Sequence, residues 1–186
     1  MRPNHQARHP AHVTLRAAGV PSLREQVIFG AVRDALAHAS RPAFRVIHYS
    51  VQSNHVHLIV EASDRESLSR GVQGLSVRVA RAVNQALARR GPVWSERYHS
   101  RALRTPRETR FALRYVLFNF RKHGHAASGV DPCSSGSSFD GFRERLPPAQ
   151  GPPVVVHART WLARRGWRRL GLLSVCDAPG AVTGVT

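Results

Sequence analysis

Residues 54–61, Asn-His-Val-His-Leu-Ile-Val-Glu, combine two histidines with an apolar run rich in β-branched side chains. Such a run is typical of a β-strand, in which successive side chains alternate between the two faces. His55 and His57 are therefore expected on one face, about 6.5 Å apart along the strand. A lone His-x-His pair is more often structural, but two imidazoles on a rigid strand can share one divalent metal ion.

Three further strands are predicted around this one. Residues 44–51 form the strand before it, and 52–54 are too short for anything but a hairpin turn. Residues 11–17 alternate between apolar and polar side chains, which indicates a short, half-buried strand. Residues 93–104 are expected to begin as an irregular segment and to continue as a fourth strand.

Helix starts are indicated by Ser/Thr-x-x-Glu capping boxes, in which a hydroxyl and a carboxylate satisfy free N–H groups of the first turn. These boxes begin at Ser22, Ser63 and Thr105. The helices are expected to run from residue 22 to about 40, from 63 to 90 and from 106 to about 123. The apolar stripe of the first helix is expected to contain Leu23, Val27, Ile28, Ala31, Ala35 and Leu36.

The order strand, helix, strand, strand, helix, strand, followed by an extra helix, predicts an α+β ferredoxin-like split βαβ fold (βαββαβ). Two helices cover one face of an antiparallel sheet and leave the other face open. His12, Thr14 and Arg16 of the first strand are expected on the open face with the two histidines.

The domain organisation follows from composition. Residues 1–10 are expected to be a loose basic arm, residues 11–125 the main domain, and residues 126–186 a Ser/Gly/Pro-rich C-terminal extension that begins as a linker or surface segment. The extension includes a short basic helix with Trp161 and Trp167. We expect these rings to make hydrophobic contacts, with stacking on bases as the alternative.

The charge is extreme: 28 Lys and Arg against 11 Asp and Glu give +17. Nearly all the cations are arginine, whose planar guanidinium pairs bidentately with phosphate. An arginine-biased genome contributes, but it would not remove acidic residues, so the balance predicts a nucleic-acid partner. The chain shows no membrane-spanning run or secretory signal, and its two cysteines are far apart. These features predict a cytoplasmic, nucleoid-associated protein.

The last predicted helix of the main domain places Tyr115 and Asn119 four residues apart, on one face. If that face packs on the open side of the sheet, the Asn119 amide oxygen can join His55 and His57 around a metal ion. Mixed nitrogen and oxygen ligands with open positions suit Mg²⁺ or Mn²⁺. Tyr115 beside a metal-bound phosphate is a candidate nucleophile that would form a covalent phosphotyrosine.

Three segments together resemble the single-tyrosine HUH transposases. Residues 49–60, Tyr-Ser-Val-Gln-Ser-Asn-His-Val-His-Leu-Ile-Val, resemble their signature, in which His-hydrophobe-His follows an Asn at a hairpin. Residues 94–98, Trp-Ser-Glu-Arg-Tyr, resemble the Trp-x-x-x-Tyr segment, and 115–119 the Tyr-x-x-x-Asn helix. The most similar subgroup is the REP-associated tyrosine transposases and related solitary insertion-sequence transposases. The resemblance covers about residues 11–125; Ser53 departs from it, since proline is common there.

The resemblance implies a bacterial enzyme in which His55, His57 and Asn119 bind Mg²⁺ or Mn²⁺ and Tyr115 attacks single-stranded DNA beside an imperfect hairpin. Attack would leave a 5′-phosphotyrosine and a free 3′-OH, and rejoining would need no external energy source. Tyr98 is the rival nucleophile. The basic residues expected to contact DNA are Arg16, Arg97, Arg101, Arg114, Arg121 and Lys122.

Two other functions remain open from the sequence. One is a domesticated hairpin-DNA-binding protein without strand transfer, and the other is a metal phosphodiesterase that does not act on nucleic acid. A monomer is slightly favoured over a dimer that exchanges tyrosine helices.

Overall fold

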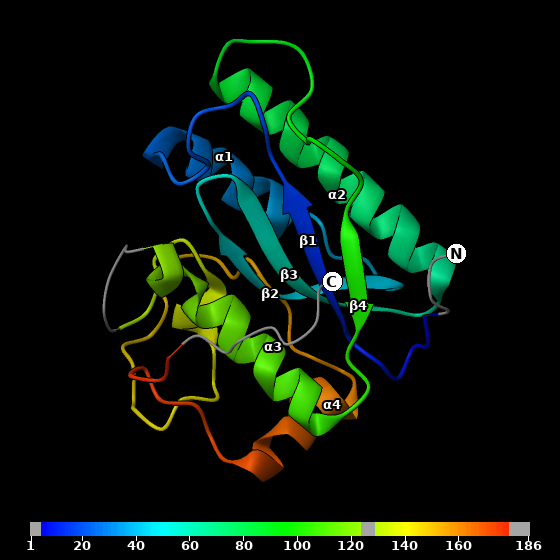
Figure 1. Cartoon of the computed structure of the whole chain (residues 1–186), viewed down its shortest axis with the longest axis vertical. Helices are drawn as coiled ribbons and strands as arrows, with labels where there is room; N and C mark the ends of the chain where they lie inside the picture. The colour runs from blue at the N-terminus through cyan, green and yellow to red at the C-terminus, as the bar shows by residue number, and fades with distance from the viewer. Residues whose placement is uncertain (1–4, 124–128, 179–186) are drawn as a thin grey trace.

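Four strands form one antiparallel sheet in the order β2-β3-β1-β4 (Figure 1). The computed structural model describes residues 5–123 and 129–178. The strands are β1 (Ala11–Arg16), β2 (Phe44–Val51), β3 (His55–Ala62) and β4 (His99–Ala102). This order, with the helices described below, confirms the predicted ferredoxin-like α+β fold.

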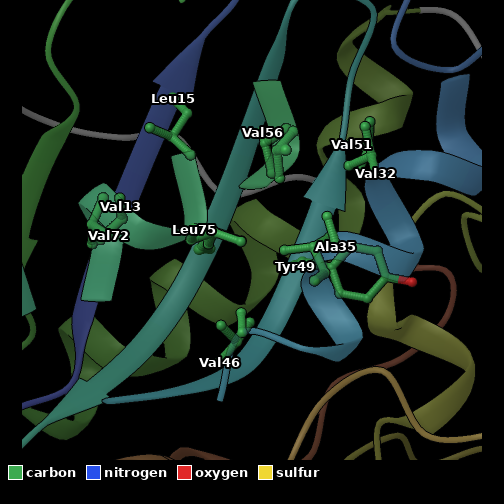
Figure 2. Close-up of a cluster of buried hydrophobic side chains, with 14 of the residues drawn as sticks. Val13, Leu15, Val32, Ala35, Val46, Tyr49, Val51, Val56, Val72 and Leu75 are labelled. Atoms are coloured by element: carbon green, nitrogen blue, oxygen red, sulfur yellow. The ribbon is translucent and has the colours of Figure 1, made fainter. Parts of the chain in front are cut away.

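Three helices flank the sheet. Helices α1 (Gln26–Ala37) and α2 (Arg65–Ala86) cover one face, whereas α3 (Pro106–Phe118) crosses the other and continues as a 3₁₀ turn, Asn119–His123 (Figure 1). The face toward α1 and α2 carries the main core, in which apolar side chains of the sheet meet those of both helices (Figure 2). The labelled core residues are Val13, Leu15, Val32, Ala35, Val46, Tyr49, Val51, Val56, Val72 and Leu75.

The predicted start of the first helix is wrong. α1 begins at Gln26 without a side-chain cap, and the Ser22 hydroxyl accepts a bond from the Arg24 N–H at 3.3 Å instead. The reason is long-range: the Arg24 guanidinium is held by Asp131, far along the chain. The buried residues of the helix are Ile28, Val32, Ala35 and Leu36, whereas Val27 of the predicted stripe is 69% exposed.

The other two helix starts agree better with the sequence. The N-cap of α2 is Asp64, one residue after the predicted Ser63, and its carboxylate accepts from the Ser67 N–H at 2.7 Å. Thr105 and Glu108 form the predicted capping box of α3. α2 ends at Ala86, four residues before the predicted end.

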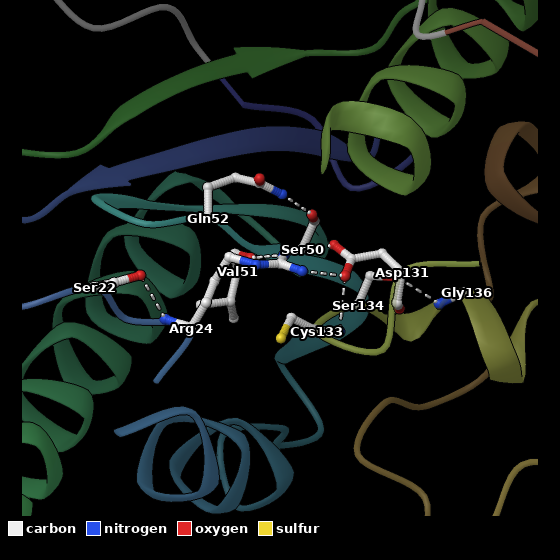
Figure 3. Close-up of polar contacts among 9 residues, drawn as sticks. All are labelled: Ser22, Arg24, Ser50, Val51, Gln52, Asp131, Cys133, Ser134 and Gly136. Atoms are coloured by element: carbon white, nitrogen blue, oxygen red, sulfur yellow. Dashed lines mark hydrogen bonds and ion pairs between the residues drawn. The ribbon is translucent and has the colours of Figure 1, made fainter. Parts of the chain in front are cut away.

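The extension packs against the domain rather than trailing from it. The Arg24 guanidinium forms two hydrogen bonds to Asp131, at 2.7 and 2.8 Å, and Val51 N–H donates to the Cys133 carbonyl (Figure 3). Figure 3 also shows Ser134 and Gly136 in this turn, beside the end of β2. The Ser/Gly/Pro composition did not indicate these contacts, which involve one buried carboxylate and the backbone of β2.

A second core lies between α3 and the extension. Its buried aromatic side chains are Phe118 from α3, Phe120 from the 3₁₀ turn, and Phe139, Phe142 and Trp167 from the extension. Trp167 belongs to a 3₁₀ helix (Gly166–Leu170) that follows the short α4 (Trp161–Arg164), and it is 1% exposed. The hydrophobic interpretation is therefore correct for Trp167.

The described part of the predicted arm, residues 5–10, is held on the domain. His5 is buried, with Nε2 3.0 Å from the Ala62 carbonyl, and Leu103 N–H donates to the Pro10 carbonyl. Residues 1–4 lie outside the described part. Within the part of the chain that the structure describes, no helix has the length and apolar character needed to cross a membrane.

Candidate active site

Two histidines of β3 form the centre of the site. β3 pairs with β1 so that Thr14 lies opposite His57 and Arg16 opposite His55. The two imidazole rings lie on one face, with centroids 4.6 Å apart. His57 is buried and His55 is partly exposed, so the pair spans from the protein interior to solvent.

Neighbouring side chains orient both imidazoles. Asn54 Oδ1 lies 2.8 Å from His55 Nδ1. Because an amide oxygen only accepts, this bond places the proton of His55 on Nδ1 and leaves a lone pair on Nε2, the form that ligates metals. Thr14 Oγ1 lies 3.1 Å from His57 Nδ1, and His12 Nε2 lies 3.3 Å from the same atom. Such bonds at the second nitrogen are how proteins orient metal-binding histidines.

Helix α3 brings the other predicted residues to these histidines in the same chain. Asn119, at the end of α3, is buried with its amide Nδ2 3.3 Å from His55 Nε2. The Tyr115 ring lies edge-on to His57, with centroids 4.9 Å apart, and 5.6 Å from the His12 ring. The i, i+4 spacing on the helix and the alternation on the strand thus converge on one spot.

The ionisation of the site follows from its burial. Burial raises the pKa of the Tyr115 phenol, which keeps it protonated at neutral pH. Burial, reinforced by the Arg101 charge, lowers the pKa of His12 to about 4, so this ring is neutral at pH 7. The Lys122 ammonium lies 4.7 Å above the Tyr115 ring and supplies a positive charge beside the phenol.

The donor set fits a hard divalent cation. Over residues 5–123 and 129–178, no group of three or more His, Cys, Asp or Glu side chains is placed to hold a metal ion. The Asn119 amide, next to His55 Nε2, could add an oxygen ligand to the histidine pair. Two imidazole nitrogens and one amide oxygen suit Mg²⁺ or Mn²⁺.

The basic residues predicted to contact DNA fall into two groups. Four of them have exposed side chains: Arg16, Arg97, Arg101 and Lys122. Arg101 pairs in register with His12, which places it beside the histidines on the open face.

Arg114 and Arg121 are engaged within the protein. Arg114 Nη2 donates to the Ala178 carbonyl at 2.9 Å. Arg121 donates to the carbonyls of Gly129, Val175 and Asp177. Both therefore tie α3 and its 3₁₀ turn to the extension, which the sequence did not indicate.

Tyr98, the rival nucleophile, packs on the other side of the sheet. Its ring is partly buried against the core that α1 and α2 cover. Thr14 and His12 are the site residues whose contacts the sequence did not specify. Only the strand register, which places Thr14 opposite His57, could have indicated them.

A helix-borne tyrosine opposite a His-x-His strand, on an open ferredoxin-like sheet, defines the class of single-tyrosine transposases. Residues 12–116 match the family model described as "Transposase IS200 like". This match spans more than half of the chain, so the chain belongs to the IS200-like transposase family, and the resemblance found in its sequence is confirmed.

One solved structure illustrates the fold. The chain is similar to "Structure of the REP associates tyrosine transposase bound to a REP hairpin", with a TM-score of 0.63 and 18% identity over 85% of this chain and 93% of that chain. At this identity the likeness supports the fold alone. No curated protein matches the chain.

Proposed function

We propose that the protein is a metal-dependent single-stranded DNA transposase or nickase that cleaves and rejoins DNA beside a hairpin. The observation that carries the proposal is the placement of Tyr115 4.9 Å from the His57 ring, with Asn119 3.3 Å from His55. The charge of +17 supports a DNA substrate. So does the similar structure, whose protein is described as bound to a REP hairpin.

Each residue of the site has a distinct role. His55, His57 and Asn119 would hold Mg²⁺ or Mn²⁺, which supplies polarisation of the scissile phosphate and stabilisation of the leaving oxygen. Lys122, above the Tyr115 ring, attracts the phosphate and favours loss of the phenol proton. The exposed Arg101 binds the strand near His12.

Bond changes balance within the DNA and the tyrosine. The Tyr115 oxygen attacks phosphorus, and the bond from phosphorus to the 3′ oxygen breaks. The phenol loses one proton and the departing 3′ oxygen gains one. The product is a 5′-phosphotyrosine and a free 3′-OH, and attack of a 3′-OH on this link rejoins a strand with the bond energy conserved.

The test uses hairpin DNA with single-stranded flanks, labelled at its 3′ end, together with Mn²⁺. Wild type is expected to form a covalent adduct that survives a denaturing gel. Tyr115→Phe should form none, whereas Tyr98→Phe should keep it. Adduct formation by Tyr115→Phe would overturn the assignment of the nucleophile.

Binding and hydrolysis measurements, made beside the adduct assay, separate the alternatives. Hairpin binding without any adduct, unchanged in His57→Ala, would instead identify a DNA-binding protein without strand transfer. Hydrolysis of a non-nucleic-acid phosphodiester, without salt-dependent DNA binding, would identify the phosphodiesterase.

A further inference from the structure

We propose that a cavity behind the β4 edge of the sheet binds one unpaired nucleobase of the substrate strand. The cavity measures about 500 Å³ and lies between α2 and residues 91–98. It is separate from the histidine site, on the face of the sheet that carries α2. The proposal rests on the proposed function, because it assigns a part of the same DNA to this cavity.

The cavity has aromatic and polar walls. Trp94 and Tyr98 line one side, and Val77 of α2 lines the other. Gln73 and Arg97 add polar groups, and both side chains are exposed. An aromatic wall suits the face of any base, the Gln73 amide can donate to or accept from a base edge, and Arg97 can pair with the adjoining phosphate.

The aromatic wall is held in place by hydrogen bonds. Trp94 Nε1 donates to the Ser76 carbonyl of α2 at 2.9 Å. The backbone of Trp94 forms a bridge with Ala17, and Ser95 N–H donates to the Arg16 carbonyl at 2.9 Å. A ring that is already fixed loses little conformational entropy when a base stacks on it.

The strand register connects the cavity to the histidine site. His99 of β4 lies opposite Thr14, whose hydroxyl contacts His57. Tyr98 immediately precedes His99, and adjacent residues of an extended chain point to opposite faces. His99 therefore faces the histidine site and Tyr98 faces the cavity. A DNA strand that leaves the site past Arg101 and crosses the β4 edge at His99 reaches the cavity at Tyr98. Figure 1 shows β4 at the edge of the sheet, with α2 beside it.

A nucleobase fits these walls better than an apolar peptide side chain. Arg97 is the cationic residue of the lining, Arg101 lies on the opposite face of β4 along the path to the histidine site, and the chain as a whole carries +17. The acidic side chain at the opening, Glu96, is paired with His99 at 3.4 Å. The surroundings thus complement a polyanion. The Trp-x-x-x-Tyr segment, which the tyrosine chemistry does not use, acquires a role as the wall of this cavity.

The test fills the cavity without disturbing the core. Val77 is 45% exposed, so Val77→Trp places its ring in the cavity rather than in the core. The matched control is Gln85→Trp, an exposed position of the same helix that lines a different groove. Binding is measured by fluorescence anisotropy on hairpin DNA with single-stranded flanks, with each unpaired nucleotide in turn replaced by an abasic one.

Wild type is expected to lose affinity about 5- to 100-fold at one abasic position, since stacking of one base on aromatic rings accounts for that range. Val77→Trp should bind the intact DNA with a similar loss and be insensitive at that position, whereas Gln85→Trp should behave as wild type. The proposal is overturned if no single position is sensitive, or if Val77→Trp binds as wild type, as it would if the cavity accepted a protein side chain.

The outcome is independent of the tyrosine chemistry, because binding is measured without cleavage. An abasic-sensitive position in a protein that forms no adduct would support the cavity and overturn strand transfer. An adduct without any abasic-sensitive position would support strand transfer and overturn the cavity proposal. Absence of DNA binding would overturn both.

Discussion

Thr14 controls the ring of His57 through one hydrogen bond, Oγ1 to Nδ1 at 3.1 Å. Thr14→Val removes the hydroxyl but keeps the shape, so the ring loses a hydrogen-bond partner that holds its orientation. We expect Mn²⁺ affinity and strand cleavage to fall about tenfold or more, the usual effect of losing a group that orients a ligand. Titration calorimetry and the adduct assay measure the two effects.

Thr14→Ser is the control, because it keeps the hydroxyl and should stay close to wild type. Equal metal affinity in the valine and serine variants would show that the hydroxyl does not orient His57.

Local rules predicted which candidate site residues lie together, but they did not predict the contacts of the neighbouring arginines. Strand alternation placed His55 and His57 together, and helical spacing did the same for Tyr115 and Asn119. The engagement of Arg114 and Arg121 could not be predicted. Their partners are backbone carbonyls, and most of these lie more than fifty residues away in the chain. A carbonyl belongs to every residue, so no side-chain pattern indicates such a contact.

Among the helices, α2 contains two glycines in different surroundings. A Cβ on Gly71 would lie 2.1 Å from Cγ of the buried Phe44 ring, whereas a Cβ on Gly74 would meet nothing within 4 Å. Gly71→Ala should lower the free energy of unfolding by about 1–3 kcal/mol, because overpacking against β2 exceeds the gain in helix propensity. Gly74→Ala should raise it by up to about 1 kcal/mol.

Urea denaturation of both variants measures the contrast within one helix. Equal stabilisation by the two alanines would mean that α2 and β2 can separate at no cost, against the close packing described here.

Helix α1 shows why local start signals are insufficient. Ser22 and Glu25 have the spacing of a capping box, as Thr105 and Glu108 do, but only the second pair forms one. The difference lies in Arg24, whose guanidinium is drawn to Asp131 and the Val51 carbonyl. A contact across about a hundred residues thus overrides a signal that extends over four.

At the scale of the whole molecule, the Arg24–Asp131 pair attaches the extension to the domain (Figure 3). Its side chains are 13% and 0% exposed. Asp131→Ala leaves a largely buried guanidinium without its carboxylate, so the free energy of unfolding should fall by about 3–5 kcal/mol. The control is Asp140→Ala, which breaks the Arg168–Asp140 pair of the same 2.7 Å length at an 81% exposed carboxylate. This substitution should lower the free energy of unfolding by less than about 1 kcal/mol. Urea denaturation compares the two, and similar losses would contradict the role given to burial.

Two partly buried histidines, His12 and His48, make the stability of the whole molecule depend on pH. Burial lowers the pKa of His12 and of His48 to about 4 each, although the Asp140 charge opposes the shift at His48. A folded pKa below the unfolded value of about 6.5 means that the unfolded chain binds more protons, so stability falls as the pH drops from about 6.5 toward 4. Between pH 7 and pH 5, each histidine lowers the free energy of unfolding by about 2 kcal/mol.

His48 can be separated from the rest because it lies away from the candidate metal site. Its Nδ1 is 3.2 Å from the Ser135 hydroxyl, and its ring meets the edge of Phe139 at 5.2 Å. His48→Gln cannot titrate, so its loss of stability between pH 7 and pH 5 should be smaller than that of wild type by about 2 kcal/mol. Denaturation of both proteins at the two pH values gives this difference directly, and the carboxylates cancel because both proteins share them. An identical loss would mean that packing between β2 and the extension does not lower the pKa of His48.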